Sequence, residues 1–447
     1  MALLNPQTER PNLKDVCVYG GKRDDEFVGI RYEEGALKVY FPSCYSAPAD
    51  GNDERAYRLD ILNLVSVLSS YSKESREFSR NPLLNKDEVR FPIHAYIHVF
   101  TYFLNDGYYV EREPCYRHGT NGKIDWARTI KHVRPQVAGR SVVYLDYIVK
   151  SSSNDENEIV AQIHRWCVFE AYEKIGCLFA YVRPERPRIP FDAKMFAAVL
   201  QSKIARTFNE KHILLFRNML DIVCHMGTKK NNDKAIYGTT DFEYVWEGLI
   251  DQVFGVGNDE KKKYFPSYTW TLYRRTGNEE NVVDWEDEKH TALRPDTIML
   301  SALNDDFAKI FVLDAKYYRH GEDPEGKSGL PATGSILKQI AYAEYIDEMR
   351  KRKTGGKRQK FPRGEIYNAF ILPYDGKNNA PSSDYALNCF GHAGCEWKTD
   401  KPYHKIYGIF LDVRAIMHRH PRHSDTAIEA LAKLIKDESA KKTAPAK

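Results

Sequence analysis

The chain has 447 residues, of which 42% are hydrophobic and 29% charged, so it is long enough for two or three domains with their own cores. A net charge of +4 excludes a chain that is basic throughout, so any surface for nucleic acid would have to be local. Eight scattered cysteines argue against a disulfide framework, and no stretch approaches the roughly 18 apolar residues of a membrane span, so we expect a reduced, cytoplasmic protein without a membrane segment or signal peptide.

The first part of the chain mixes strand and helix patterns. The predicted elements are two strands within 26–43, helices over 57–72 and 91–104, two strands around a Gly-Asn-Gly turn within 107–135, a strand over 141–150 and a helix over 157–176. This alternation predicts an α+β N-terminal domain over residues 1–190.

A Pro-rich segment at 183–190 predicts a connector, and two helical patterns follow near 192–207 and 210–226. The polar stretch 226–238 marks the last boundary. The predicted remaining parts are a helical connector over 191–235, an α/β domain with a mixed sheet flanked by helices over 236–440, and a disordered tail over 441–447.

Within the last domain, the stretch FVLDAKYY at 311–318 reads as a core strand that ends in an acid and a base. Because side chains alternate along a strand, Asp314 and Lys316 lie on one face. A second strand candidate at 293–303 carries Asp296 near its start. If the two strands pair as a hairpin, Asp296 lies opposite Asp314 or opposite Lys316.

Two carboxylates and a lysine at one strand end suit phosphodiester chemistry. Mg²⁺ prefers oxygen ligands and often takes one or two carboxylates together with water and phosphate. A bound Mg²⁺ would polarise the phosphodiester and lower the pKa of a water. We expect Asp296 and Asp314 to bind Mg²⁺, with Mn²⁺ as a substitute, and Lys316 to assist the attacking water. The alternative is an exposed ion pair of Asp314 and Lys316 that contributes little.

Two helical patterns flank this pair of strands. Residues 239–255 place five apolar side chains on one face, and Glu247 lies beside that face as a third possible metal ligand. Residues 335–349 carry Gln339 as a candidate for positioning substrate or water, with Tyr342 one turn later as a core residue. The order of these motifs resembles the PD-(D/E)XK nuclease fold, through Glu247, Pro295-Asp296, Asp314-Ala315-Lys316 and Gln339.

A second resemblance covers roughly residues 90–440. GKIDWARTIKHVRPQ at 122–136, far upstream of the nuclease-like motifs, resembles the LlaJI-type restriction endonucleases, which are similar to the McrC nuclease subunit of modification-dependent systems. The resemblance implies a subunit that cuts double-stranded DNA together with a separate AAA+ McrB-like GTPase, which recognises DNA and translocates. It also implies that the upstream domain docks on this partner and stimulates its GTPase.

The residues of 122–136 have no individual role that the sequence assigns. One interpretation is a strand pair with Trp126 and Ile130 in a core, and the other is an interface with a partner. Arg128 and Lys131 could equally contact DNA phosphates.

Other motifs suggest different chemistry. GEDPEGKS at 321–328 fits the Walker A pattern, but Gly-Leu-Pro follows where a helix must begin, so we expect a loop. CFGHAGC at 389–395 lacks the second ligand pair of a typical zinc site. The basic runs at 350–360 and 418–423 are candidates for DNA phosphate contacts or simply solvated charges.

The hypothesis is therefore a Mg²⁺-dependent endodeoxyribonuclease subunit of a restriction system that defends against phage. One alternative is an assembly subunit that mainly activates the GTPase, and another is a stand-alone, sequence-specific restriction enzyme. The sequence leaves open the recognition site, the methylation state of the target, the oligomeric state and the docking surface.

Overall fold

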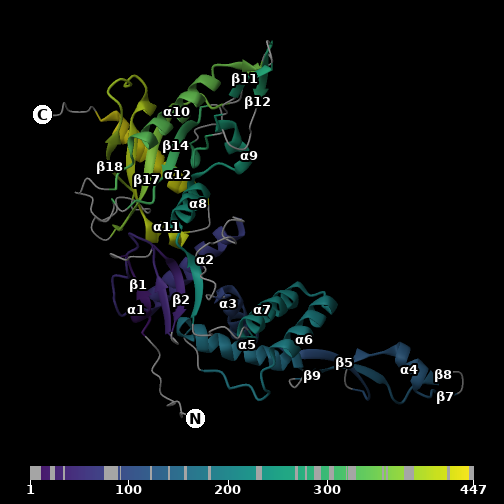
Figure 1. The fold of residues 1–447 in the computed structure, drawn as a ribbon. Helices are drawn as coiled ribbons and strands as arrows, with labels where there is room; N and C mark the ends of the chain where they lie inside the picture. Colours follow the sequence, from purple (N-terminus) through teal and green to yellow (C-terminus); the bar gives the residue numbers. More distant parts are fainter. Residues whose placement is uncertain are drawn as a thin grey trace. The chain divides into compact units, whose positions relative to one another are not determined.

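The computed structural model is a mixed α/β protein with several sheets and helices (Figure 1). The structure describes residues 12–20, 26–33, 36–74, 89–90, 92–120, 123–138, 141–155, 159–179, 183–227, 234–266, 270–276, 279–285, 293–301, 307–318, 320, 329–354, 357–358, 361–376, 387–419 and 423–441. Its packing divides the chain into two compact units: residues 32–37 with 84–237, and residues 12–31 and 38–83 with 238–447. None of the helices in these ranges is long and apolar enough to cross a membrane.

The first unit contains a bundle of helices. Its elements are α3 (Ile93–Asp106), α5 (Ile159–Ile175), η2 (Gly176–Leu178), α6 (Ala193–Arg206), α7 (Glu210–Gly227) and a parallel pair of strands, β4 (Val89–Arg90) with β10 (Lys234–Thr239). Helix α3 packs on α5 and α7, because each has an apolar stripe that is buried in the bundle. The predicted polar break at 226–238 is thus partly wrong, since β10 lies within it.

A second part of this unit, residues 111–155, forms what we call the arm. It contains β5 (Glu111–His118), β6 (Lys123–Ile124), α4 (Trp126–His132), β7 (Gln136–Ala138), β8 (Ser141–Val143) and β9 (Ile148–Asp155). Strand β9 pairs antiparallel with both β5 and β6, and β7 pairs with β8. The arm extends away from α5, α6 and α7, with α4, β7 and β8 at its far end (Figure 1).

The prediction of two strands within 107–135 is only partly right. The second strand, β6, has two residues and is followed at once by α4. Asp125 ends the strand and caps the helix, since its side chain accepts a hydrogen bond from the Arg128 backbone N–H at 3.0 Å. A helix-capping aspartate thus overrides the strand pattern.

The second unit is built around a five-stranded mixed sheet in the order β13-β14-β17-β19-β18. Its strands are β13 (Thr297–Ser301), β14 (Lys309–Ala315), β17 (Ile366–Tyr374), β18 (Asn388–Ala393) and β19 (Ile406–Asp412). Strands β13 and β14 form the predicted antiparallel pair, whereas β14, β17 and β19 run parallel. Both faces of β14 and β17 are buried, which is typical of parallel strands covered by helices.

Helices cover this sheet. They are α8 (Phe242–Phe254), α10 (Thr333–Met349), α11 (Val413–Arg419) and α12 (Asp425–Ala440), with the short helices α9 (Asn258–Lys261), η3 (Lys262–Tyr264) and η6 (Pro402–His404) between them. Side chains of α10 form a core with even-numbered residues of β13 and β14, such as Ile298, Ile310 and Val312. Helix α8 packs against β13, β14 and α12, and the five apolar residues predicted to share its face are all buried.

The second unit also contains small pairs of strands. Strands β11 (Trp270–Thr276) and β12 (Glu279–Trp285) form a hairpin, and β15 (Lys353–Thr354) pairs with β16 (Lys357–Arg358). The first hairpin is an element that the sequence analysis missed, because its charged and polar residues do not give the alternation of a half-buried strand.

The N-terminal segment contributes α1 (Leu13–Val16), β1 (Cys17–Val18), β2 (Val28–Glu33), β3 (Ala36–Tyr40) and the long helix α2 (Glu54–Glu74). Residues 38–83 belong to the same compact unit as the five-stranded sheet. Helix α2 packs on α11, where Asp60, which is completely buried, accepts hydrogen bonds from Arg414 Nε at 3.0 Å and from His418 Nε2 at 2.5 Å. The Arg414 guanidinium and the His418 ring therefore both bond to one oxygen of this buried carboxylate.

Candidate active site at the end of strand β14

The β13–β14 hairpin places two predicted site residues side by side. Its register pairs Thr297 with Leu313, so Asp296 and Asp314 stand opposite one another one step beyond the last pair. The Asp296 Oδ2 atom accepts a hydrogen bond from the Ala315 backbone N–H at 3.0 Å. Both of these aspartates are half-buried. The first of the two registers allowed by the sequence is thus the observed one.

Lys316 completes this cluster. Its Nζ atom lies 2.9 Å from Asp314 Oδ1 and 2.8 Å from Asp314 Oδ2. The Lys316 backbone N–H donates to the Ile371 carbonyl at 2.9 Å, which continues the pairing of β14 with β17. The lysine is therefore fixed at both its backbone and its ammonium group, and its side chain is only 20% exposed. This is a partly buried pair rather than the exposed one of the alternative interpretation.

Helix α8 brings a third carboxylate, Glu247, which is half-buried. Trp246, the residue before it, donates from Nε1 to the Ile371 carbonyl at 3.3 Å, which ties α8 to the same end of the sheet. Burial raises the pKa of Glu247, with the charge of Lys316 lowering it and the charge of Asp314 raising it. Glu247 is therefore within electrostatic reach of both residues.

The charges at this site are unbalanced. Burial raises the pKa of Asp296 to about 9, helped by the hydrogen bond and charge of Asp314 and by the charge of Glu247, while Lys316 works in the opposite direction. Burial disfavours the charged form of Lys316, but the charge and hydrogen bond of Asp314 outweigh it, so the pKa of Lys316 is raised. Three carboxyl groups thus lie near the Lys316 ammonium group at the strand end.

A second lysine, which the sequence analysis missed, lies behind the carboxylates. Lys261 Nζ lies 2.8 Å from Asp251 Oδ1 and also donates to the backbone carbonyl of Asp296. The Lys261 side chain is 11% exposed, whereas that of its neighbour Lys262 is 69% exposed. Three consecutive lysines read as a solvated run, and nothing in the sequence marks the first of them as buried.

Gln339 is fully buried on α10, below the carboxylates rather than among them. Its Nε2 group donates to the Val312 carbonyl at 3.0 Å and to the Ala369 carbonyl at 3.3 Å, so it bridges β14 and β17. Tyr342, predicted to be a core residue, is buried and donates from its hydroxyl group to the Arg294 carbonyl at 3.2 Å. Both side chains of α10 therefore hold the backbone of the strands that carry the aspartates.

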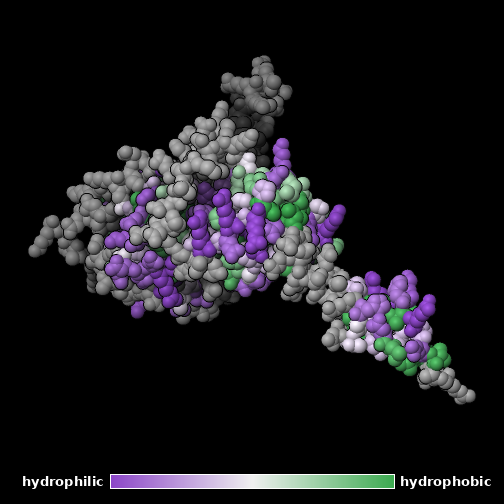
Figure 2. Space-filling view, turned by 90° about the horizontal axis from the view of Figure 1, so that it is seen from below, coloured by the Kyte–Doolittle hydropathy of each residue, from purple (hydrophilic) through white to green (hydrophobic). Residues whose placement is uncertain are grey.

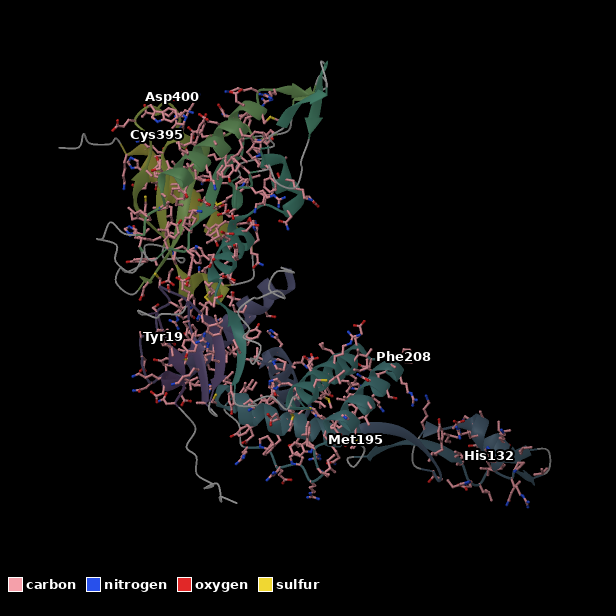
Figure 3. All side chains as sticks on the ribbon, in the orientation of Figure 1. Tyr19, His132, Met195, Phe208, Cys395 and Asp400 are labelled. Carbon is pink, nitrogen blue, oxygen red and sulfur yellow. The ribbon has the colours of Figure 1, made fainter. Side chains whose placement is uncertain are left out.

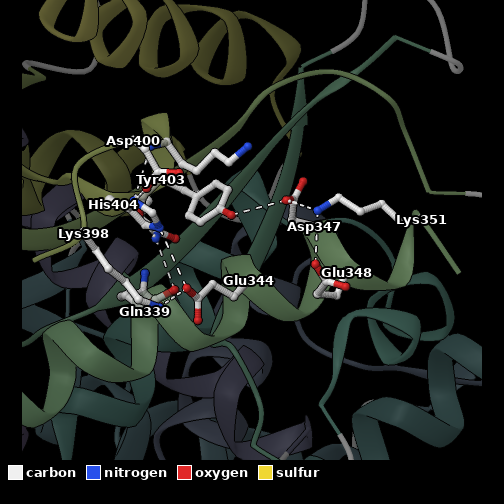
Figure 4. Close-up of polar contacts among 11 residues, drawn as sticks. Gln339, Glu344, Asp347, Glu348, Lys351, Lys398, Asp400, Tyr403 and His404 are labelled. Atoms are coloured by element: carbon white, nitrogen blue, oxygen red, sulfur yellow. Dashed lines mark hydrogen bonds and ion pairs between the residues drawn. The ribbon is translucent and has the colours of Figure 1, made fainter.

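Further along α10, acidic side chains bind the η6 region (Figure 4). Asp347 accepts hydrogen bonds from Tyr403 Oη at 3.4 Å and from Lys351 Nζ at 2.9 Å, and Glu344 pairs with Lys398. These carboxylates are paired with cations or hydroxyl groups, whereas Asp296 at the strand end has other carboxyl groups as neighbours.

The donor set at the strand end fits a hard divalent cation. Asp296 and Asp314 offer carboxylate oxygens, and the pKa of Asp296 is raised first by burial and then by Asp314 and Glu247, so a bound cation would favour its ionised form. Within the described ranges no three His, Cys, Asp or Glu side chains are gathered closely enough to hold a metal by themselves, and this includes the Cys389–Cys395 region once considered for zinc. Mg²⁺ commonly completes its shell with water and phosphate, so two carboxylates suffice for it.

The arm exposes several large hydrophobic side chains. Trp126 and Ile130 are 53% and 62% exposed, so the interpretation that places them in a core is wrong. Figure 2 shows hydrophobic side chains on the arm among hydrophilic ones, and Figure 3 marks His132 at the end of α4. The other exposed large hydrophobic residues of the arm are Val137, Val142, Val143 and Leu145.

Several sequence predictions lie outside the described residues. They are the Walker A-like stretch at 321–328, the tail at 442–447, and parts of the basic runs at 355–356, 359–360 and 420–422.

Comparison with known proteins assigns the chain to a family. The chain is 24% identical over 340 residues to the Type II restriction enzyme BsuMI component YdjA of Bacillus subtilis (strain 168), which covers 73% of this chain and 68% of that protein. The family model for the LlaJI restriction endonuclease matches residues 27–388, which is most of the chain. The chain therefore belongs to the LlaJI restriction endonuclease family.

Proposed function

We propose that this chain is a Mg²⁺-dependent endodeoxyribonuclease subunit that cuts double-stranded DNA at the end of strand β14, within a PD-(D/E)XK fold. The observation that carries the proposal is the convergence of Asp296, Asp314 and Lys316 at one strand end, with Glu247 within electrostatic reach. Membership of a restriction endonuclease family supplies the reaction class.

In this proposal Asp296 and Asp314 hold the metal ion, and Glu247 supports it from α8. A bound Mg²⁺ would polarise the scissile phosphodiester and neutralise its charge. The Ala315 N–H fixes the Asp296 carboxylate, and the Asp314 carboxylate fixes the Lys316 ammonium group. Lys316 then lies where it can orient the attacking water and stabilise the developing negative charge.

Gln339 acts on the site indirectly, through the strand backbone. We expected it to position substrate or water, but its amide group is fully buried and bonded to the carbonyls of Val312 and Ala369. In the proposed mechanism it holds β14 and β17 in register and so keeps Asp314 in place. Its role is therefore to position the strand.

The proposal also includes a partner protein. The related Bacillus protein is named as a component of a restriction enzyme, and the family resemblance implies an AAA+ GTPase. The arm is the surface we assign to this partner, because exposed apolar patches on soluble proteins commonly mark protein contacts. Trp126 and Ile130, four residues apart, are neighbours on one face of α4. Arg128 lies between them in the sequence, and its guanidinium carbon is 3.8 Å from the centre of the Tyr116 ring.

The test is cleavage of a supercoiled plasmid, unmodified or cytosine-methylated, by the chain co-expressed with its neighbouring gene product, with Mg²⁺ and with or without GTP. Wild type should cut only with Mg²⁺ and GTP, and Asp314→Ala and Lys316→Ala should each lose on the order of 100-fold or more of that activity. Equal cutting by wild type and Asp314→Ala would rule out the site.

The same experiment separates the two alternatives. A subunit that mainly activates a GTPase would raise GTP hydrolysis in both wild type and Lys316→Ala without any cleavage. A stand-alone restriction enzyme would cut at a specific site without nucleotide or partner. In a matched comparison, Trp126→Ala should lose GTPase stimulation but keep metal binding.

A further inference from the structure

We infer that Lys261 is a positioning residue of the cleavage site, which fixes Asp296 of strand β13 relative to helix α8. This inference rests on the proposed function. Its basis is the pair of contacts made by one ammonium group: with the Asp251 carboxylate at 2.8 Å and with the backbone carbonyl of Asp296.

Strand β13 is the edge strand of the sheet, so its outer carbonyl groups need partners from elsewhere. The loop after α8 supplies the first, since the Val256 N–H donates to the Ile298 carbonyl at 2.9 Å. Two residues earlier along the same edge, Lys261 supplies the second by donating to Asp296. A side-chain cation thus takes the place of a backbone N–H at the residue whose carboxylate faces the site.

The other partner of Lys261 belongs to the helix that carries Glu247. Asp251 lies four residues after Glu247, which is one helical turn along α8. Lys261 therefore connects the helix that bears one carboxylate of the site to the strand that bears another. Among the described residues, the Trp246 indole provides another bond from α8 to this sheet end, but it reaches β17 rather than β13.

The neighbours of Lys261 provide matched controls. Lys262 pairs with Asp259 and Lys263 with Glu260, at 2.9 and 2.7 Å, and both pairs lie at the surface. Removing an exposed pair has little effect on stability. Lys262→Met therefore removes the same charge from the same short segment without touching β13 or α8.

The first readout is Mn²⁺ binding to the full-length chain, measured by calorimetry and by the electron paramagnetic resonance of free Mn²⁺. Lys261→Met should weaken Mn²⁺ binding on the order of 10- to 100-fold, as is typical when a residue that orients a ligand is removed. Lys261→Arg should recover most of the affinity, and Lys262→Met should bind as wild type does. Wild-type affinity in a folded Lys261→Met protein would overturn the inference.

A merely structural role is tested by neutralising both partly buried charges, those of Lys261 and Asp251. Lys261→Met alone leaves the Asp251 carboxylate without its cation, so it is expected to lower the melting temperature. The double variant Lys261→Met/Asp251→Asn removes that charge and should regain stability, while its Mn²⁺ binding stays weak because the Asp296 backbone carbonyl still lacks the Lys261 ammonium group. If stability and Mn²⁺ affinity recover together, Lys261 only supports the fold and the inference fails.

The outcome also distinguishes this inference from the proposed function. If wild type binds no Mn²⁺ and cuts DNA like Asp314→Ala, the cleavage site is wrong and the role of Lys261 falls with it. If wild type binds Mn²⁺ and Asp314→Ala does not, while Lys261→Met is unaffected, only the inference about Lys261 is overturned.

Discussion

Two aspartates of the second unit have opposite surroundings. Asp60 on α2 is completely buried and accepts hydrogen bonds from the side chains of Arg414 and His418. Asp296 before β13 is half-buried and meets two further carboxyl groups, Asp314 and Glu247, while its Oδ2 atom accepts a hydrogen bond from the Ala315 backbone N–H. The first environment supplies two donors to one oxygen of a buried carboxylate, and the second gathers acidic groups. The difference separates a carboxylate that links two helices from one whose surroundings the proposed cation would relieve.

The largest expected effect is the loss of stability when Asp60 is replaced. Asp60→Asn keeps the volume of the side chain but leaves Arg414 without its anionic partner, so we expect a loss of about 3 kcal/mol in the free energy of unfolding. Chemical denaturation of the full chain measures it. Asp259→Asn, in an exposed pair with Lys262, serves as the control and should change stability by less than about 1 kcal/mol. If Asp60→Asn also changed stability by less than about 1 kcal/mol, the proposed difference between Asp60 and Asp296 would be wrong.

Divalent cations should stabilise the protein through Asp296 and not through Asp60. Because a ligand that binds the folded state stabilises it, Mg²⁺ or Mn²⁺ at 100 times its dissociation constant should raise the free energy of unfolding by about 2.7 kcal/mol in the wild type. Asp296→Asn should show no such gain, whereas Asp60→Asn should show it in full. Thermal unfolding with and without metal gives both values, and an equal gain in the Asp296 variant would place the metal elsewhere.

The pH dependence should have a definite sign. The pKa of Asp296 in the folded state is raised to about 9, above the ordinary value of an aspartate in the unfolded chain. A carboxyl group whose pKa is higher in the folded state than in the unfolded state contributes stability at low pH. This contribution is lost as the pH rises toward the folded-state pKa. Without metal, wild type should therefore lose stability relative to Asp296→Asn between pH 5 and 8, on the order of 1 kcal/mol per pH unit. A difference that is flat across this range would contradict the assigned environment.

The smallest expected effect on stability concerns Tyr317, the residue after Lys316. The Ser43 backbone N–H donates to Tyr317 Oη at 2.7 Å, and the Tyr317 ring lies 5.2 Å from that of Phe242. Tyr317→Phe removes the hydrogen bond but keeps the ring, so we expect a loss of about 1 kcal/mol. Denaturation measures it, with Tyr318→Phe, at the exposed next position, as the matched control.

Local patterns were sufficient to predict much of the site. The apolar spacing of α8 and α10, the β13–β14 pairing and the position of Asp314 beside Lys316 all follow from periods of 3.6 and 2 residues, which the structure reproduces. These features depend on neighbours in the sequence, which is why a single sequence reveals them.

Contacts between distant residues could not be predicted in this way. Lys261 looks like its two solvated neighbours until the structure places Asp251 and Asp296 around it. Trp126 and Ile130 have the spacing of a buried face, but the sequence does not say whether the same chain covers that face. The burial of Asp60 depends on partners on α11, and no local period encodes them.

The contact between α2 and α11 also bears on how the chain is made. Asp60 leaves the ribosome long before Arg414, which lies 354 residues later in the sequence. Until that point the part of α2 that packs on α11 lacks its partner, and the first unit must fold while the second is still incomplete. Such late closure of a distant contact slows folding and leaves the intermediate open to aggregation. Production of the chain should therefore respond to chaperone supply and to the rate of translation upstream of residue 413.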